Sequence, residues 1–203
     1  MSPPAVSTII FDLGGVLFEL SGARLVCEWT RERLTPAELL EKWLASPAVR
    51  DFECGRIDFA VFRARLKEEL ELQVSDDIFT DAFAGWITGA YPGAEELLQA
   101  LSARYRLACL SNTNAFHWDI LEREYDLLPL FDHVFASFRM GLVKPDPDAF
   151  DHVVTALDRP AGSLAFFDDS RANVEAALSC GLRAFRVDGV NGVRRVLREE
   201  GLL

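Results

Sequence analysis

Three apolar stretches that lie far apart in the sequence each end in polar side chains. The polar residues that directly follow them are Asp12, then Ser111 and Asn112, and finally the pair Asp168 and Asp169. If the stretches are parallel strands, their carboxyl ends meet at one edge of a sheet, which is where ligands bind in open α/β proteins. We therefore expect these five residues to share one site.

The residue types at this edge suit the transfer of a phosphoryl group. A carboxylate such as Asp12 can attack phosphorus to form an acyl phosphate, which water then hydrolyses. The reaction depends chiefly on charge neutralisation, and Mg²⁺ prefers oxygen ligands. Ser111 and Asn112 precede a predicted helix, where a hydroxyl and free backbone N–H groups suit a phosphate oxygen. Lys144, in a loop stiffened by prolines, can offset the repulsion between carboxylate and phosphate.

Each of these residues also has an ordinary structural interpretation when it is taken alone. An aspartate at a strand end is commonly a helix N-cap or a turn former. The run from Ser111 to Asn114 is a good helix cap, and a single lysine is usually part of the solvated surface. It is the combination of all of them, in this order, that favours a phosphate site.

The combination resembles the haloacid dehalogenase superfamily of phosphohydrolases. The family's four motifs recur in order, with Asp12 in the first, Ser111 in the second, Lys144 in the third, and Asp168 with Asp169 in the fourth. The resemblance covers essentially the whole chain. It is nearest to the branch with a small helical cap after the first motif, which includes sugar-phosphate phosphatases and the phosphatase domain of soluble epoxide hydrolases.

The resemblance implies a magnesium site and a set of supporting residues. The implied ligands of Mg²⁺ are Asp12, Asp169 and the backbone carbonyl of Gly14. Asp168 and Asn173, in an Asp-Asp-Ser-x-x-Asn segment, resemble groups that orient the lysine or a metal-bound water. A direct metal contact by Asp168 is the alternative, and the sequence leaves both open.

Gly14 is the one departure from the family pattern. Most phosphatases of the family carry a second aspartate two residues after the nucleophile, which protonates the leaving group and later activates water. General acid–base catalysis of this kind contributes about 10²–10⁴-fold, and glycine cannot supply it. A water molecule, a residue of the cap or the substrate itself could provide the proton instead.

Two further residues are candidates for contact with the substrate. Glu53 lies in a segment, residues 52–56, that resembles the family's substrate-facing cap loop, and a plain turn is the alternative. His117 lies one helical turn beyond Thr113, so it could face the site, and an ordinary histidine on a helix surface is the alternative.

The order of the predicted elements indicates an α/β protein with a Rossmann-like, three-layer core around a parallel sheet. We expect the core to comprise residues 1–17 and 90–203, where strands alternate with helices, and a helical cap to comprise residues 18–89. Residues 22–88 contain no recognisable strand, and Phe59, Phe62, Leu66 and Leu70 fall on one helical face. Gly22 and Gly89 are the expected hinges of the cap.

Bulk properties restrict the partners. The formal net charge of −11 disfavours nucleic acid, and no apolar run approaches the roughly 20 residues of a membrane span. The first seven residues do not resemble a signal peptide, so we expect a cytoplasmic protein with reduced thiols. The four cysteines are Cys27, Cys54, Cys109 and Cys180. The oligomeric state stays open.

Together these observations predict a Mg²⁺-dependent phosphomonoesterase that acts on a small phosphorylated metabolite through an aspartyl-phosphate. One alternative is a metal-free 2-haloacid dehalogenase, which would use Asp12 to displace halide and would not need Asp169. The other is a weakly active or non-enzymatic member of the family that binds phosphorylated ligands without a general acid.

Overall fold

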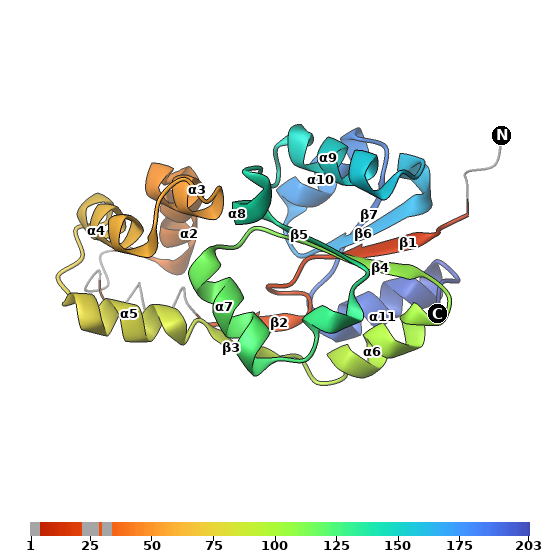
Figure 1. Ribbon diagram of the computed structural model, residues 1–203, viewed down its shortest axis with the longest axis horizontal. Helices are drawn as coiled ribbons and strands as arrows, with labels where there is room; N and C mark the ends of the chain where they lie inside the picture. Colours follow the sequence, from red (N-terminus) through yellow and green to blue (C-terminus); the bar gives the residue numbers. More distant parts are fainter. Residues whose placement is uncertain (1–4, 22–28, 30–33) are drawn as a thin grey trace.

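The computed structural model describes residues 5–21, 29 and 34–203, and it has the expected layered α/β architecture (Figure 1). In chain order the elements are β1 (Thr8–Phe11), β2 (Phe18–Leu20), α2 (Pro36–Ala45), α3 (Pro47–Glu53), α4 (Phe59–Glu69), α5 (Asp76–Ala84), β3 (Ile87–Ala90), α6 (Ala94–Ser102), β4 (Arg106–Ser111), α7 (Ala115–Glu124), the 3₁₀ turn Leu128–Leu130, β5 (His133–Ala136), α8 (Ser137–Met140), α9 (Pro147–Leu157), the 3₁₀ turn Ala161–Ser163, β6 (Leu164–Asp168), α10 (Arg171–Ser179), β7 (Arg183–Arg186) and α11 (Gly189–Glu199).

A five-stranded parallel sheet forms the centre of the core, with strand order β5-β4-β1-β6-β7. The chain leaves β1 in the middle and builds outward on both sides, so the strand order reverses beside β1. This reversal is the point where open α/β sheets bind ligands. The three strands that carry the site residues, β4, β1 and β6, are neighbours there. The predicted fold class is confirmed.

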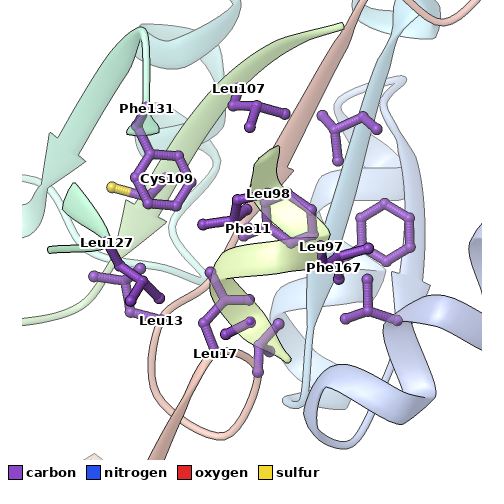
Figure 2. Packing of buried hydrophobic residues seen from close by; sticks show 14 of the residues in the cluster. Phe11, Leu13, Leu17, Leu97, Leu98, Leu107, Cys109, Leu127, Phe131 and Phe167 are labelled. Atoms are coloured by element: carbon purple, nitrogen blue, oxygen red, sulfur yellow. The ribbon is translucent and has the colours of Figure 1, made fainter. Parts of the chain in front are cut away.

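Helices cover both faces of the sheet, which explains why its central strands are apolar throughout. Ile9 and Phe11 of β1 face one apolar cluster, whereas Ile10 between them faces the other. Figure 2 shows the first cluster, in which Phe11 and Phe167 from adjacent strands pack beside α6; their ring centroids are 5.5 Å apart. The central strands are therefore held rigidly, and so are the residues at their ends.

The cap is a group of four described helices, α2 to α5, with an aromatic core of its own. Phe62, Leu66 and Leu70 are buried in it and Phe59 packs against it, so the predicted helical face is confirmed. Thr35 and Ser46 cap α2 and α3, whose first residues are Pro36 and Pro47.

The expectation that residues 22–88 contain no strand is wrong. β3 begins at Ile87 and pairs antiparallel with β2, so a two-stranded ribbon joins the cap to the core. Gly89 lies within β3 and has a φ of 151°. The strand was not recognisable because it is only four residues long and contains a glycine, and its partner is distant in sequence. The second expected hinge, Gly22, lies outside the described residues.

None of the described helices is long and apolar enough to cross a bilayer. Cys54, Cys109 and Cys180 are free thiols, whereas Cys27 lies outside the described residues. In the core, strands alternate with helices as the sequence predicts.

Gly55 is where the end of α3 comes closest to α8 of the core. It has a φ of 68°, and a Cβ atom there would lie 2.3 Å from the backbone oxygen of Phe138. Gly141, which ends α8, has a similar φ of 72° but has nothing within 4 Å of its Cβ position. The two glycines therefore share a backbone conformation and differ in packing.

We expect Gly55→Ala to destabilise the protein more than Gly141→Ala does. Both substitutions force alanine into the left-handed region, which costs about 1–2 kcal/mol. Only Gly55→Ala also pushes α3 away from α8. Chemical denaturation of the two variants measures the difference in the free energy of unfolding. Equal losses would mean that the contact between α3 and α8 contributes nothing to stability.

Candidate active site

A buried lysine lies between two aspartates at the carboxyl edge of the sheet. The ammonium nitrogen of Lys144 is 2.6 Å from Oδ2 of Asp168 and 3.0 Å from Oδ1 of Asp12. All three side chains are buried, so the ion pairs are weakly screened by solvent. The residues predicted from β1, from β6 and from the loop before α9 therefore meet at one point.

The carboxylate of Asp168 is held by the turn that follows β6. Its Oδ1 accepts hydrogen bonds from the backbone N–H of Ser170 at 2.8 Å and from Nδ2 of Asn173 at 3.0 Å. Asn173 also reaches Oδ2 at 3.1 Å. The turn and Asn173 therefore fix the carboxylate of Asp168 against the ammonium of Lys144.

Asn112 fixes the other end of the lysine. Its Nδ2 donates to the backbone carbonyl of Lys144, its Oδ1 accepts from the backbone N–H of Lys144, and both distances are 2.8 Å. Ser111 is buried at the end of β4, beside this pair. Asn112 is a predicted contact of the phosphate, and the structure shows its side-chain amide engaged with the backbone of Lys144.

Three carboxylates gather at this edge. Oxygen atoms of Asp12, Asp168 and Asp169 lie within 4.8 Å of one another. A Cβ atom at Gly15 would lie 2.5 Å from Oδ2 of Asp169, so only glycine lets the loop after β1 approach this carboxylate so closely. Lys144 balances only part of the negative charge, and hard cations such as Mg²⁺ bind oxygen ligands of this kind.

Burial and neighbouring charges have opposing effects on the pKa values of Asp12 and Lys144. Burial raises the pKa of Asp12 to about 7; the charge of Lys144 opposes this rise, and Asp168 adds to it. Burial acts to lower the pKa of Lys144, but the carboxylates of Asp12 and Asp168 outweigh it and the pKa is raised. Lys144 therefore stays charged, and a further cation would favour the ionised form of Asp12.

Glu53 brings a fourth carboxyl group from the cap. It is the last residue of α3, and it lines the same cavity as Asp12 and Lys144. Among the described residues its carboxyl group has no hydrogen-bond partner. Burial raises its pKa to about 7, with Lys144 opposing and Asp12 adding to the shift. A carboxylic acid that can carry a proton near neutral pH thus shares the cavity of Asp12.

The cavity above Asp12 has a volume of about 500 Å³ and lies between core and cap. A second cavity of about 160 Å³ adjoins it, and the two share Gly14, Glu53, Ser111 and Asn112 among their lining residues. Gly14 has no positive φ. A Cβ atom there would lie 2.6 Å from Cδ1 of Leu20, so hydrocarbon occupies the space beyond Gly14.

Comparison with known proteins agrees with this geometry. The sequence pattern of the haloacid dehalogenase-like hydrolase family matches residues 6–181. The chain belongs to this family. It is 22% identical to a D-ribitol-5-phosphate phosphatase of Bacteroides thetaiotaomicron, covering 89% of this chain and 91% of that one. It is 31% identical to a sesquiterpene phosphatase of Aspergillus oryzae, covering 85% of each chain.

A solved structure shares the fold of this haloacid dehalogenase-like hydrolase. It is a family enzyme of Bacteroides thetaiotaomicron, determined in complex with magnesium and inorganic phosphate, with a TM-score of 0.74. The sequence identity is 23%, and the alignment covers 91% of this chain and 95% of the other. At this identity the likeness concerns the fold alone.

His117 is placed differently from the other predicted site residues of this hydrolase. Its Nε2 is 2.7 Å from the backbone oxygen of Phe83 in the cap, so Nε2 carries the proton and donates it. Its Nδ1 is 3.3 Å from Nδ2 of Asn114. Burial lowers the pKa of His117 to about 4, so the ring is neutral. His117 lines the smaller cavity, but both of its nitrogens already face protein atoms.

Several residues around the site were not identified from the sequence. Trp43 lines both cavities and Trp86 lines the smaller one. From the sequence alone, neither can be distinguished from an aromatic residue of the cap's own core. Arg50 of α3 forms an ion pair with Asp146 beside Lys144. No spacing in the sequence links these residues to the motifs, because their contacts depend on how cap and core pack.

We expect Lys144→Met to destabilise the protein strongly at pH 8 and less at pH 5. Without the ammonium, Asp12 and Asp168 are buried beside each other, and breaking a buried ion pair costs about 3–5 kcal/mol. Burial already raises the pKa of Asp12, and without the ammonium the pKa of Asp12 in the folded state should rise further above its unfolded value. The cost is therefore small while Asp12 is protonated and grows as the pH rises through its folded pKa.

Denaturant unfolding in EDTA at both pH values measures this difference. Lys67→Met is the matched control, because Lys67 pairs at 2.6 Å with Asp76, which is exposed on the cap. We expect that control to change stability by less than about 1 kcal/mol at either pH. A pH-independent loss in Lys144→Met would contradict the view that charge balance is what Lys144 provides.

Proposed function

We propose that the protein is a Mg²⁺-dependent phosphomonoesterase that transfers the phosphoryl group of a small phosphorylated metabolite to Asp12 and then to water. The observation that supports this most directly is the position of Asp12. It lies at the switch point of the sheet, beside a buried lysine and two further aspartates. The phosphatases among the relatives agree with this reaction class.

One oxygen of Asp12 is oriented and the other is free to react. Oδ1 accepts the backbone N–H of Leu13 at 2.8 Å and pairs with Lys144 at 3.0 Å. Oδ2 has no hydrogen-bond partner among the described residues. In the proposed reaction Oδ2 forms a bond to phosphorus as the ester P–O bond breaks, and the leaving oxygen takes up a proton. Water then attacks phosphorus, which releases phosphate and regenerates the carboxylate.

The residues present fit a magnesium ion. Asp12 and Asp169 would hold it together with the backbone carbonyl of Gly14, and a bound ion would neutralise charge on the phosphate oxygens. The excess of carboxylates over cations at this edge supports the assignment. A metal-free dehalogenase would need neither the carboxylate of Asp169 nor the close approach of Gly15 to that carboxylate.

The other residues have supporting roles in this proposal. Lys144 offsets the repulsion between the attacking carboxylate and the phosphate, with Asp168, Asn173 and Asn112 fixing its position. Ser111 lines the cavity, and its hydroxyl would donate to a phosphate oxygen. Glu53 is the candidate to protonate the leaving oxygen, because among the described residues it is the carboxyl group that the cap directs into the cavity of Asp12.

The central test is turnover by Asp12→Asn. An amide oxygen is a poor nucleophile, so we expect this variant to lose essentially all phosphatase activity while its unfolding curve stays close to that of the wild type. EDTA should abolish activity in the wild-type protein, and added Mg²⁺ should restore it. Chloride release from a 2-chloro acid in EDTA would favour the dehalogenase instead, and phosphate-ester binding without turnover would favour the non-enzymatic alternative.

We expect Glu53→Gln to slow alkyl phosphates far more than aryl phosphates. An alkoxide needs a proton as it leaves, whereas p-nitrophenolate does not, so loss of the acid should cost about 10²-fold or more only for the alkyl ester. Steady-state kcat on both esters measures the effect. Glu68→Gln, at an exposed position on the cap, is the control.

The same experiment can use Gly14→Asp as a rescue. Gly14 does not have a positive φ, and the atom that a new Cβ would meet is the end of the flexible Leu20 side chain. Aspartate at position 14 should therefore fold and return part of the alkyl-ester rate to Glu53→Gln. Equal fractional losses on both esters, with no rescue, would argue against a proton-donating role for Glu53.

A further inference from the structure

The smaller cavity beside the nucleophile has an apolar lining. The residues that give it this character are Phe18, Leu20, Trp43, Trp86, Ile87 and Leu121. Its volume is about 160 Å³, and an apolar cavity of about 150 Å³ holds a molecule the size of benzene. It adjoins the cavity of Asp12, so a group bound here can belong to the same ligand as the phosphate.

Two of the polar side chains in this cavity are already engaged within the protein. Asn114 accepts the backbone N–H of His117 at 2.9 Å, and its amide nitrogen faces the ring of the same residue. The other ring nitrogen of His117 donates to Phe83 in the cap. The side chains of Glu53 and Ser111 and the indole N–H of Trp86 have no hydrogen-bond partner among the described residues. A hydroxyl of a polyol that these groups leave unmatched would lose its water partners on entering, and unmatched buried polar groups are costly.

The mouth of the larger cavity is also apolar. Leu20, Leu40 and Leu44 line it, and they are 55%, 56% and 75% exposed. Together with Trp43 they form a surface of hydrocarbon directly beside the charged site of Asp12 and Lys144. A ligand whose phosphate binds at Asp12 has one end fixed beside these side chains. The rest of the same ligand would then cover them.

From these observations we propose that the alcohol part of the substrate is a hydrocarbon, either a branched or straight chain or an aromatic ring, and not a polyol. This inference rests on the proposed phosphatase function and specifies its substrate class. The phosphate occupies the charged edge of the sheet, and the hydrocarbon extends along Leu20 and Trp43 into the smaller cavity or over the leucines of α2. Removing apolar surface from water then provides the selectivity.

The test measures kcat/KM for four esters with Mg²⁺: geranyl monophosphate, n-decyl phosphate, p-nitrophenyl phosphate and ribose 5-phosphate. We expect at least one of the hydrocarbon esters to exceed ribose 5-phosphate by more than about tenfold, chiefly through a lower KM. The geranyl, decyl and aryl esters distinguish the three kinds of hydrocarbon. A preference for ribose 5-phosphate would overturn the proposal.

A double variant tests the surface itself. Leu40→Asn with Leu44→Asn should raise KM for the preferred hydrocarbon ester more than for ribose 5-phosphate. Leu178→Asn is the matched control, because Leu178 is 52% exposed on α10 and does not line the cavity. An unchanged ranking of esters, together with a change from dimer to monomer in sedimentation, would mean that these leucines face a second copy and would overturn the proposal.

Binding to Asp12→Asn separates this proposal from the reaction. Trp43 and Trp86 line the cavities, so tryptophan fluorescence should report a titration with geranyl monophosphate in Mg²⁺. If the wild-type protein hydrolyses no ester, tight binding of geranyl monophosphate that the double variant weakens would refute the phosphatase and support the hydrocarbon site. Equal or tighter binding of ribose 5-phosphate would refute the hydrocarbon site whether or not the protein is a phosphatase.

Discussion

The placement of a positive charge inside the protein is the constraint on which the site depends. Lys144 is buried between Asp12 and Asp168, and each of the three would be costly to bury without the others. Their positions follow from the ends of two adjacent strands and from the loop that Asn112 clamps. Because these strands are buried on both faces, the charges are held where a phosphate and a cation can complete the balance.

The cap completes this arrangement from the other side of the cavity. Its contacts with the core include the hydrogen bond from His117 to Phe83, the stacked rings of Phe59 and Phe116 at 4.3 Å, the ion pair of Arg50 with Asp146, and the close approach of Gly55 to α8. Glu53 of the cap thereby lines the same cavity as Asp12. Burial raises the pKa values of both carboxyl groups.

The sequence predicted the core and its charged residues well, because apolar strands and the groups at their ends leave a local signal. Asp12, Lys144 and Asp168 meet as expected. The sequence could not predict that Asn112 holds a backbone 32 residues away, or that β3 pairs with β2. The sequence also could not distinguish an aromatic residue that lines the cavity from one in the hydrophobic core of the cap, because the sequence around Trp43 is compatible with either position. These features arise only when cap and core pack together.

Gly14 and Leu20 connect the chemistry of the site to its shape. In most phosphatases of the family an aspartate at position 14 would project into the space that Leu20 fills here, since a Cβ atom at Gly14 would lie 2.6 Å from the leucine side chain. Glycine at this position supplies no carboxyl group and leaves the hydrocarbon of Leu20 along the wall of the cavity of Asp12. In the proposed reaction Glu53, which lines the same cavity from the cap, would protonate the leaving oxygen in place of that aspartate. The proposed hydrocarbon substrate and the proposed acid of the cap are therefore consistent with each other, because an acid carried by the cap leaves the apolar wall at Gly14 and Leu20 intact.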